Sequence, residues 1–461
     1  MHAGQCDADL LTRWPKSKPV RIDDRKSMSN SYIETALIYL LPLVAIMITY
    51  LMRRKEQEKT SVHTYQENLV GGLTEPPSLH PIIDPNLCMG SGTCITACPE
   101  KAIGFIRGKA VLINPTHCIG HGACLPACPH HAINLVFGTE KRGMDIPEVS
   151  QTFETNVPGI FIAGELGGMG LIGKSASQGS QAVAAIAKLK GSANALDVVI
   201  IGAGPAGLSA SLGAIENKLR FVTLEQETSL GGTIFHYPRN KITMTSRVRF
   251  PIIGEVKMGE ISKENLLEFF NGIVEKTGLK INLNERMETI TKTDRGFIVK
   301  TSRQTYETRA VLLSIGRRGT PRKLGVPGEE LPKVVYSLID PAQYQGMHVL
   351  VVGGGDSALE AAISISEEPG TTVSISYRSA AFGRGKPKNN EKLKAAEARG
   401  RIRVLLGSNV KLIEPDKVHL EQNGEAVSMS NDAIIVCAGG ILPTPFLKEI
   451  GIMVETKHGT A

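Results

Sequence analysis

Aromatic residues make up only 5% of this 461-residue chain, and no long block of basic residues occurs in it. Its 52 lysines and arginines only mildly exceed its 45 aspartates and glutamates, which gives a formal net charge of +7 spread along the chain. Nucleic-acid-binding proteins usually carry a clustered basic surface and aromatic rings for base stacking, so we expect no nucleic-acid partner. Cysteine pairs of the C-x2-C type are also absent, which excludes the common structural zinc sites.

Charge is missing from one long stretch near the N-terminus. Residues 35–52 contain no charged side chain, and a helix of this length can just cross the hydrocarbon core of a bilayer. Arg53, Arg54 and Lys55 follow directly, which favours exit of the chain into the cytoplasm. A cleaved signal peptide is the alternative, but no small-residue cleavage site follows the stretch.

These features predict a membrane protein with a single anchor. We expect an N-terminal tail over residues 1–30, a transmembrane helix over residues 31–52, and a polar linker over residues 53–80. The soluble domains that follow would face the cytoplasm from the cell inner membrane.

Six of the eight cysteines fall in two matching blocks of the form C-x5-C-x3-C-P. The two blocks form an internal repeat, and a cytoplasmic compartment argues against reading them as a disulfide framework. The six cysteines are Cys88, Cys94, Cys98, Cys118, Cys124 and Cys128.

This repeat resembles that of the bacterial two-cluster ferredoxins, C-x2-C-x2-C-x3-C-P, with the second cysteine of each block replaced by Ser91 and His121. The resemblance implies a ferredoxin-like domain over residues 81–139 with two iron–sulfur clusters. In that family the last cysteine of each block ligates the other cluster. The implied ligand sets are therefore Cys88, Cys94 and Cys128 for one cluster and Cys118, Cys124 and Cys98 for the other.

Three thiolates for each cluster leave the cluster type open. They suit a 3Fe-4S cluster, or a 4Fe-4S cluster whose fourth iron binds a hydroxyl, an imidazole or water. Ser91 and His121 stand in the places of the missing ligands, and they could equally point away. The sequence does not choose between these possibilities.

Residues 197–226 have the pattern of a dinucleotide-binding unit. A short apolar strand is followed by Gly202, Gly204 and Gly207 in G-x-G-x-x-G spacing, then by a helix and a second strand that ends at Glu225. The first two glycines allow a tight turn and a close backbone approach to a pyrophosphate, and the third lets the helix pack on the strand. A carboxylate at the position of Glu225 can accept hydrogen bonds from an adenosine ribose.

Residues 153–189 resemble the carboxy-terminal closing segment of the thioredoxin reductase-like flavoproteins, although here they precede the glycine turn. In that family the acid after the glycine of this segment contacts the flavin, and Gly164 and Glu165 hold those positions. Residues 432–460 resemble what the family places just before its closing segment, and Gly232 lies in a further matching stretch. The resemblance implies FAD as the cofactor and a circularly permuted flavoprotein.

A second strand, glycine turn and helix begin near residue 348, with Gly353, Gly355 and Ala358 in G-x-G-x-x-A spacing. We expect a second dinucleotide site here for NADP(H) or NAD(H). The strand that follows ends without a carboxylate, at Tyr377 and Arg378. Because arginine can hold a 2'-phosphate, NADPH is favoured over NADH, and Arg384 is expected to assist.

The fold class implied is α/β, with two doubly wound Rossmann-like domains, a small α+β ferredoxin-like domain and one transmembrane helix. The expected boundaries of the flavoprotein part are 140–192 for the permuted closing segment, 193–325 for the FAD domain, 326–430 for the NAD(P) domain and 431–461 for the return to the FAD domain.

The permutation has a geometric consequence. Residues 159–163 should form a strand beside residues 198–201, with residues 433–438 nearby. Ala461 should lie within roughly 20 Å, a short-loop distance, of the segment near Gly143.

The stretch from residue 328 to residue 353 contains no cysteine, although thioredoxin reductases carry a C-x2-C there. A dithiol relay is excluded, and the chain resembles the ferredoxin-NAD(P) reductase branch. We expect hydride transfer from NAD(P)H to the flavin, then single-electron transfer through the clusters to a quinone, a cytochrome or a ferredoxin. No side-chain acid or base is required. The alternatives are a reductase of a small soluble substrate such as a disulfide, and a redox sensor; a homodimer is compatible with any of them.

We predict that the full-length protein fractionates with membranes and resists a high-salt wash, because the uncharged helix would be buried in lipid rather than held by charge. Deletion of residues 1–55 should release a soluble flavoprotein. Western blotting of fractionated cells measures both outcomes, and recovery of the full-length protein in the cytosol would contradict the prediction.

Overall fold

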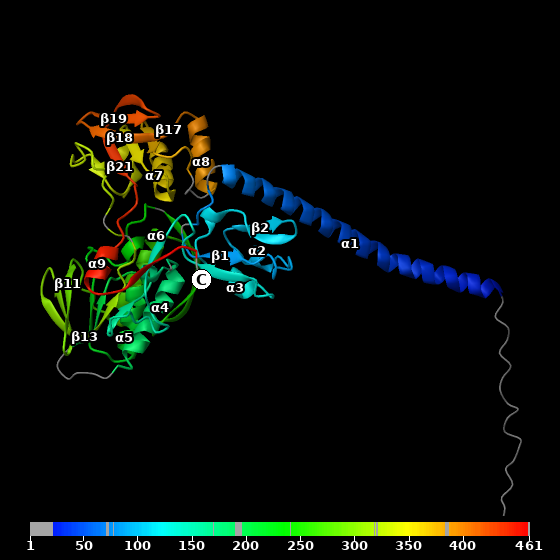
Figure 1. Ribbon diagram of the computed structural model, residues 1–461, viewed down its shortest axis with the longest axis horizontal. Coiled ribbons are helices and arrows are strands. Elements are labelled where there is room, and N and C mark those ends of the chain that lie inside the picture. The colour runs from blue at the N-terminus through cyan, green and yellow to red at the C-terminus, as the bar shows by residue number, and fades with distance from the viewer. Residues whose placement is uncertain are drawn as a thin grey trace, which may run out of the picture. The chain divides into compact units, whose positions relative to one another are not determined.

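The computed structural model describes residues 22–70, 73–76, 78–168, 170–189, 196–239, 241–317, 319, 321–382 and 387–459. Its helices and strands are labelled in Figure 1. The chain divides into two compact units, residues 1–61 and 62–461, and each is treated by itself.

Helix α1 extends over Ile22–Val70, beyond both predicted ends of the transmembrane segment. Residues 53–70, the first part of the expected linker over residues 53–80, are helical, and their role as a linker stays a prediction. They contain no glycine or proline and are rich in lysine, arginine, glutamate and glutamine, which are strong helix formers. The large apolar side chains between residues 37 and 52 are exposed, and among the described residues this helix is long and apolar enough to cross a membrane by length and composition.

The cysteine-rich part folds as a small α+β domain with twofold internal similarity. Strand β1 (His80–Ile83) pairs antiparallel with β4 (Ile133–Val136), and β2 (Ile103–Ile106) pairs with β3 (Lys109–Leu112). The short helices α2 (Thr93–Ala97) and α3 (Cys124–Ala127) contact one another, and a 3-10 turn covers Pro115–His117. This arrangement confirms the expected ferredoxin-like fold.

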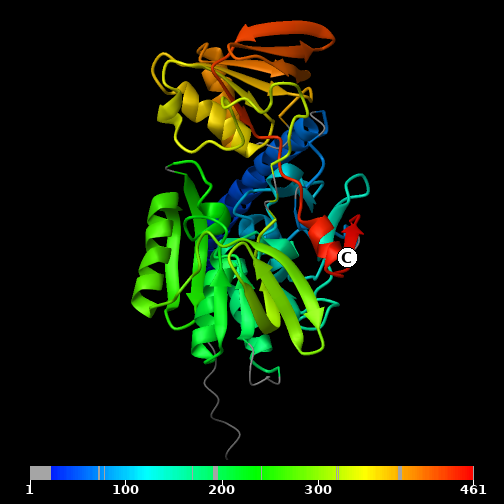
Figure 2. The same cartoon turned by 90° about the vertical axis from the view of Figure 1, so that its left-hand side faces the viewer.

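The first large domain is built on a six-stranded sheet in the order β11-β12-β13-β7-β8, with β6 also paired to β13 (Figure 2). Its strands are Met287–Thr293 (β11), Gly296–Thr301 (β12), Thr305–Leu313 (β13), Leu196–Ile201 (β7), Phe221–Leu224 (β8) and Ile160–Ile162 (β6). The neighbouring helices and hairpin are α4 (Ile172–Ile186), α5 (Pro205–Glu216), α6 (Lys263–Thr277), β9 (Ile242–Phe250) and β10 (Gly254–Ser262).

Strand β6 enters this sheet beside β13 and not beside β7, so the expected direct pairing with residues 198–201 is wrong. The reason lies in the two edges of β13. One edge pairs with β7, and the other pairs with β12 only as far as Thr308. The rest of that edge, Val311–Leu313, is then available to β6.

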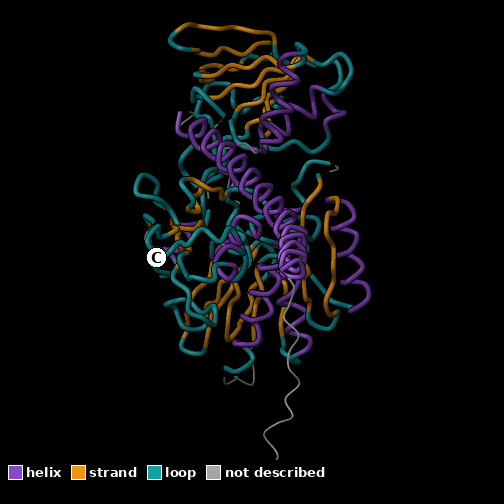
Figure 3. The backbone as a smooth tube through the Cα atoms, turned by 90° about the vertical axis from the view of Figure 1, so that its right-hand side faces the viewer, coloured by secondary structure: helices purple, strands orange, loops and turns teal. Residues whose placement is uncertain are grey.

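Side chains of this sheet alternate between two buried cores, as expected for strands covered on both faces. Phe161, Val198 and Ile200 face α4 and α5, whereas Ile160, Ile162 and Val199 pack with Leu447 of α9 (Thr444–Glu449). Figure 3 shows the strands flanked by helices. Residues from upstream and downstream of the first glycine turn thus form one domain, as the circular permutation predicts.

The second large domain has a parallel sheet in the order β14-β21-β15-β16-β17 and a three-stranded antiparallel sheet. Its parallel strands are Val334–Val335 (β14), Ala433–Val436 (β21), His348–Val352 (β15), Thr372–Tyr377 (β16) and Ile402–Leu406 (β17). The antiparallel strands and the helices are Ser408–Ile413 (β18), Lys417–Gln422 (β19), Glu425–Ser430 (β20), Asp356–Ser366 (α7), Pro387–Ala398 (α8) and the 3-10 turn Pro341–Tyr344.

Strand β21 belongs to this second sheet, so the expected contribution of residues 433–438 to the FAD domain is wrong. The chain returns to the first domain only afterwards, near the isolated bridge between Pro321 and Gly440. Strand β21 lies in the second domain and not in the FAD domain because it pairs in parallel with β15 there, and all four of its residues are buried.

The C-terminal segment then pairs with the chain that leaves the cysteine-rich domain. Strand β22 (Val454–Lys457) runs antiparallel to β5 (Met144–Pro147), with Lys457 opposite Met144. The Gly459 amide donates a hydrogen bond to the Phe137 carbonyl at 2.9 Å. The red C-terminal segment beside the cyan one is visible in Figure 2. Ala461 itself lies outside the described residues, but Lys457 and Gly459 meet the segment near Gly143 as predicted.

Close packing of α4 on α5 gives a stability test of the permuted fold. A Cβ on Gly179 would lie 2.0 Å from the Ala206 carbonyl oxygen, so Gly179→Ala must push the two helices apart. We expect a loss of about 1–3 kcal/mol in the free energy of unfolding, measured by denaturant titration, together with reduced FAD content.

Gly213→Ala is the matched control at the same helix pair. Its Cβ would lie 3.6 Å from Val183, an ordinary contact, so helix propensity should stabilise this variant by up to about 1 kcal/mol. Equal stability of both variants would show that α4 does not pack on α5 as described.

Candidate functional site

The first glycine turn joins β7 to α5 with backbone in direct contact. Gly202 has φ 102°, and a Cβ there would lie 2.5 Å from the Ser314 carbonyl oxygen. A Cβ on Gly207 would lie 1.8 Å from the Gly202 carbonyl oxygen. Only glycine fits at these two positions, and the turn leaves the N-terminus of α5 open toward a cavity.

Glu225 is buried at the end of β8, with 5% of its surface exposed. Its carboxylate accepts hydrogen bonds from the Ala203 amide at 2.7 Å and from the Glu227 amide at 3.1 Å. These bonds hold the carboxylate at the glycine turn, on the wall of the same cavity. The location agrees with the predicted ribose contact, which itself stays a prediction.

A cavity of about 910 Å³ brings together six of the predicted flavin residues. They come from segments that are far apart in the sequence, and this volume lies within the range of small-molecule sites. The six are Gly164, Glu165, Gly202, Gly204, Glu225 and Gly232.

The upstream closing segment supplies one wall of this cavity. The Gly164 amide donates to the Gln178 side chain at 2.8 Å, and Gly164 has φ 86°. Helix α4 begins at Ile172, and both Ile172 and Ser175 line the cavity. The amino-terminal end of α4 therefore faces the cavity.

Arg317, which sequence reasoning missed as an individual residue, links this wall to β5. Its guanidinium donates to the Asp145 carbonyl at 2.9 Å. Burial lowers the pKa of Arg317, and the nearby charges of Glu165 and Asp145 oppose that shift. Arg317 thus interacts electrostatically with Glu165 and donates a hydrogen bond to β5. The double arginine after Gly316 was the available sequence signal.

The second glycine turn is built in the same way as the first. Gly353 has φ 146°, and a Cβ there would lie 2.4 Å from the Cys437 carbonyl oxygen. Gly355 precedes the first residue of α7, and Ala358 is fully buried. None of these three residues lines the 910 Å³ cavity.

An aromatic pair covers this second turn. The Tyr377 ring lies 2.4 Å from where a Gly354 Cβ would be, and it stacks on Phe382 with ring centroids 5.6 Å apart. Arg378 is exposed beside it, and Arg384 lies outside the described residues. The exposed guanidinium of Arg378 is accessible to a phosphate, and its predicted role stays a prediction.

The two cysteine blocks have matching backbone geometry. Gly90 and Gly92 lie between Cys88 and Cys94, and Gly120 and Gly122 lie at the equivalent places in the second block. All four glycines have φ between 70° and 80°. Left-handed residues of this kind turn successive amides inward, an arrangement that binds anionic groups.

The electrostatic interactions among the cysteine thiols fall into two groups. Burial raises the pKa of the Cys94 thiol, and Cys88 and Cys128 add to the rise. Burial raises the pKa of the Cys118 thiol to about 11, with Cys98 and Cys124 among the groups that act on it. We call Cys88, Cys94 and Cys128 the Cys94 set, and Cys98, Cys118 and Cys124 the Cys118 set.

These two sets coincide with the ligand sets that the ferredoxin resemblance implies, and the ligation itself stays a prediction. Cys128 also acts on Cys124, so the sets are near neighbours. None of the seven described cysteines forms a disulfide bond. Among the described residues, no three His, Cys, Asp or Glu side chains converge as a single metal ion requires. A multi-iron cluster has a different requirement, because its ligands bind separate iron atoms.

Backbone amides already point at three of the sulfurs. The Ala102 amide lies 3.4 Å from the Cys98 sulfur, and the Ala132 amide lies 3.4 Å from the Cys128 sulfur. The Ala110 amide lies 3.5 Å from the Cys88 sulfur. Hydrogen bonds to sulfur stabilise thiolate charge and tune cluster potential. The Ser91 hydroxyl lies 3.2 Å from the Thr93 hydroxyl, and its role as a ligand stays open.

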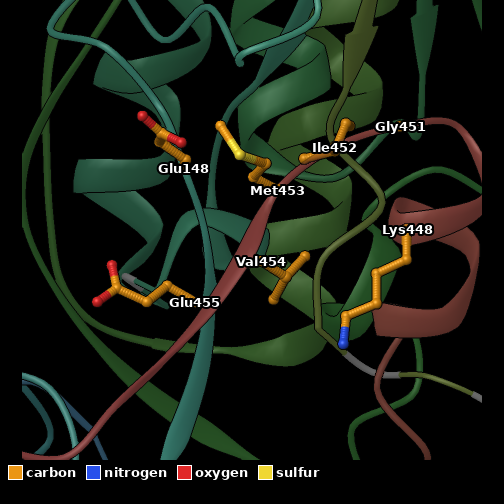
Figure 4. A pocket seen from close by; sticks show the side chains of 7 residues that line it. All are labelled: Glu148, Lys448, Gly451, Ile452, Met453, Val454 and Glu455. Carbon is orange, nitrogen blue, oxygen red and sulfur yellow. The ribbon is translucent and has the colours of Figure 1, made fainter.

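A second hollow, of about 510 Å³, lies beside β22. Figure 4 shows the charged side chains around it, Glu148, Lys448 and Glu455, pointing in different directions. It contains none of the predicted site residues and offers no convergent binding group.

Comparison with known proteins agrees with this geometry. Residues 199–460 match the pyridine nucleotide-disulphide oxidoreductase family, and residues 80–129 match the 4Fe-4S dicluster domain. The chain belongs to the pyridine nucleotide-disulphide oxidoreductase family. This family member is therefore an FAD-dependent, NAD(P)H-dependent oxidoreductase with an iron–sulfur domain.

Individual relatives differ in their named substrates. The chain is 30% identical to a ferredoxin–NADP reductase of Thermus thermophilus over 56% of this chain and 77% of the relative. It is 27% identical to the bacilliredoxin reductase Bdr of Bacillus subtilis over 57% of this chain and 82% of the relative. The structure of a bacillithiol disulfide reductase from Staphylococcus aureus aligns with a TM-score of 0.51 and 26% identity, over 56% of this chain and 80% of that one. Family membership thus leaves the electron acceptor undecided.

The grouping of cysteines predicts crossed effects of substitution. Cys128→Ala should damage the cluster of the Cys94 set, and Cys98→Ala should damage that of the Cys118 set, although each cysteine belongs in sequence to the other block. Iron analysis and EPR spectroscopy of the purified variants measure which cluster is lost. Loss of the cluster of its own block in both variants would show that the clusters assemble locally.

Proposed function

We propose that this oxidoreductase moves electrons between NADPH and a membrane or protein acceptor through FAD and two iron–sulfur clusters. FAD exchanges a hydride with the nicotinamide and single electrons with the clusters. The observation that carries the proposal is that both cysteine sets lie in a domain joined to the flavin domain by the hydrogen bond from the Gly459 amide to the Phe137 carbonyl, beside the β5–β22 pairing.

The residues of the first cavity fit FAD. Gly202 and Gly207 allow the tight turn, and Gly204 leaves bare backbone on the cavity wall, so a pyrophosphate can approach the N-terminus of α5. Glu225 is held in place to accept a ribose hydroxyl, and Glu165 stands on the wall formed by the closing segment. The proposed flavin ligands are Gly202, Gly204, Gly207, Glu225, Gly232, Gly164 and Glu165.

The residues of the cysteine-rich domain fit iron–sulfur clusters. Six thiols stand in two sets, glycine-bearing loops surround them, and backbone amides point at the sulfurs. We infer two clusters, one for each set. Three protein thiolates for each cluster are compatible with 3Fe-4S or with 4Fe-4S completed by Ser91, His121 or water.

The absence of a dithiol supports electron transfer over disulfide reduction. No cysteine occurs between residues 328 and 353, and Cys437 lies outside the two cysteine blocks. The names of the bacillithiol and bacilliredoxin relatives favour the alternative, a reductase of a small disulfide. The two proposals differ in whether the clusters take part in turnover.

The second glycine turn fits a pyridine nucleotide. We infer that Gly353 and Gly355 receive its pyrophosphate, that Ala358 completes the motif by letting α7 pack on the sheet, and that Arg378 contacts a 2'-phosphate. An exposed guanidinium at the end of β16 and the lack of an acid there favour NADPH over NADH.

We further infer that the exposed apolar stretch of α1 anchors the protein in the cell inner membrane, with the soluble domains in the cytoplasm. This location would give the enzyme access to a quinone or a cytochrome of the membrane. A soluble ferredoxin is the other candidate acceptor.

Anaerobic stopped-flow mixing with NADPH tests the electron-transfer function. We expect the flavin absorbance to bleach first and the cluster signals to follow, because the flavin alone accepts a hydride. EPR of samples frozen during the reaction measures cluster reduction. Clusters that stay oxidised through turnover with a small disulfide would contradict the proposal and support the disulfide reductase; no reduction by NADPH or NADH would support a redox sensor.

A further inference from the structure

The cysteine-rich domain contacts the flavin cavity wall through one aromatic ring. A Cβ on Gly168 would lie 2.8 Å from the Phe137 ring and 3.1 Å from Ile146. The ring therefore rests on the backbone of Gly168. The Gly168 amide donates to the Glu165 carbonyl at 2.8 Å, and Glu165 lines the cavity. Phe137 thus lies one short turn from the proposed flavin site.

Phe137 is held in this place from both sides. Its carbonyl accepts the Gly459 amide, and a Cβ on Gly138 would collide with the Lys457 carbonyl oxygen at 2.0 Å. The C-terminal segment therefore clamps the end of β4 against the flavin domain.

The Cys118 set lies at the same end of this domain. His80 pairs with Val136 as the last pair of the β1–β4 ladder, and Leu79 and Phe137 are the next residues beyond it. The Cys118 thiol donates to the Leu79 carbonyl at 3.7 Å. A Cβ on Gly120, two residues after Cys118, would lie 3.3 Å from the Leu79 side chain. Leu79 therefore connects the Cys118 loop to the Phe137 end of the sheet.

The contacts of the Cys94 set run elsewhere. The Cys88 sulfur accepts from the Ala110 amide in β3, and the Cys88 carbonyl accepts from Lys109 at 2.6 Å. A Cβ on Gly92 would lie 2.7 Å from the Phe105 ring in β2. Met89, next to Cys88, is 70% exposed. Cys88 of this set thus contacts the β2–β3 hairpin, and its neighbour Met89 is exposed to solvent.

We propose that Leu79 and Phe137 position the Cys118 set against the flavin cavity, so that this set exchanges electrons with the flavin and the Cys94 set exchanges them with the external acceptor. The proposal rests on the electron-transfer function above. One hydride from NADPH brings two electrons and one proton. A flavin bound here would pass its two electrons on one at a time, each through the cluster held by the Cys118 set and then the cluster held by the Cys94 set to the external acceptor, and the single proton would go to water.

A matched pair of cysteine variants tests the order. Cys94 and Cys124 occupy equivalent positions in the two blocks and are similarly buried, at 5% and 7% exposed. In Cys94→Ala, the surviving Cys118 set should be reduced after the flavin as fast as in the wild type. In Cys124→Ala, the surviving Cys94 set should lose its rapid reduction by NADPH while dithionite still reduces it. Iron content and the EPR signal of each variant verify which set survives.

Two aromatic variants test the contact while all ligands are kept. Phe137→Ala should slow cluster reduction several-fold without changing flavin reduction by NADPH or the midpoint potentials of the clusters. Phe105→Ala, which removes the ring next to the Cys94 set, should leave the first cluster reduction unchanged. An altered potential in Phe137→Ala would indicate a merely structural role and overturn the proposal.

The remaining outcomes separate the two proposals. Rapid NADPH-driven reduction of the Cys94 set in Cys124→Ala, or equal slowing in both aromatic variants, overturns the assigned order and leaves the electron-transfer function intact. A wild-type protein whose clusters stay oxidised after flavin reduction rejects the proposed function itself.

Discussion

The flavin domain depends on a backbone-to-backbone contact between α4 and α5. Gly179 lies so close to the Ala206 carbonyl that no side chain fits between the two helices. This contact brings α4, which precedes the first glycine turn in the chain, onto the helix that follows that turn. The wall that carries Glu165 and the turn that carries Gly202 thereby face one cavity. Without the contact the two halves of the proposed flavin site would be separate.

Circular permutation is compatible with this domain because the rearranged ends lie together. Strands β5 and β22 pair at the place where the chain enters and leaves the flavin domain, so the relocated segment needs no long connection. The cores on both faces of the sheet contain residues from upstream of the first glycine turn, and α9 closes one of them. The same junction attaches the cysteine-rich domain through Phe137 and Gly459. The junction of β5 and β22 thus both closes the permuted flavin domain and attaches the cysteine-rich domain to it.

The chemistry proposed for this protein depends on where the cofactors are held and does not depend on reactive side chains. Hydride and electron transfer need the flavin, the nicotinamide and the clusters held at fixed places, and they need no protein acid or base. Glycine turns, helix ends and thiol sets supply those places. This explains why the proposed site consists mainly of backbone and cysteine, with Glu165 and Glu225 as its proposed carboxylates.

Sequence alone determined the features that depend on local spacing. Both glycine turns, the cysteine repeat and the apolar stretch of α1 are encoded within short segments, and the permutation followed from the order of two such segments. The structure agrees with these predictions because a glycine turn or a cysteine loop has the same conformation wherever it occurs in a chain. The end of α1 was harder to predict, because residues 53–70 are polar, as in a linker, and yet they continue the helix.

Only the tertiary structure decided which strands pair and which loops meet. Strand β6 lies beside β13 because β12 leaves part of that edge unpaired, and β21 joins the second sheet because β15 offers it a parallel partner. The contact of Phe137 with Gly168 likewise joins residues with no shared motif. Pairing and packing of this kind depend on the free edges and surfaces left by the rest of the fold, and no short segment carries that information.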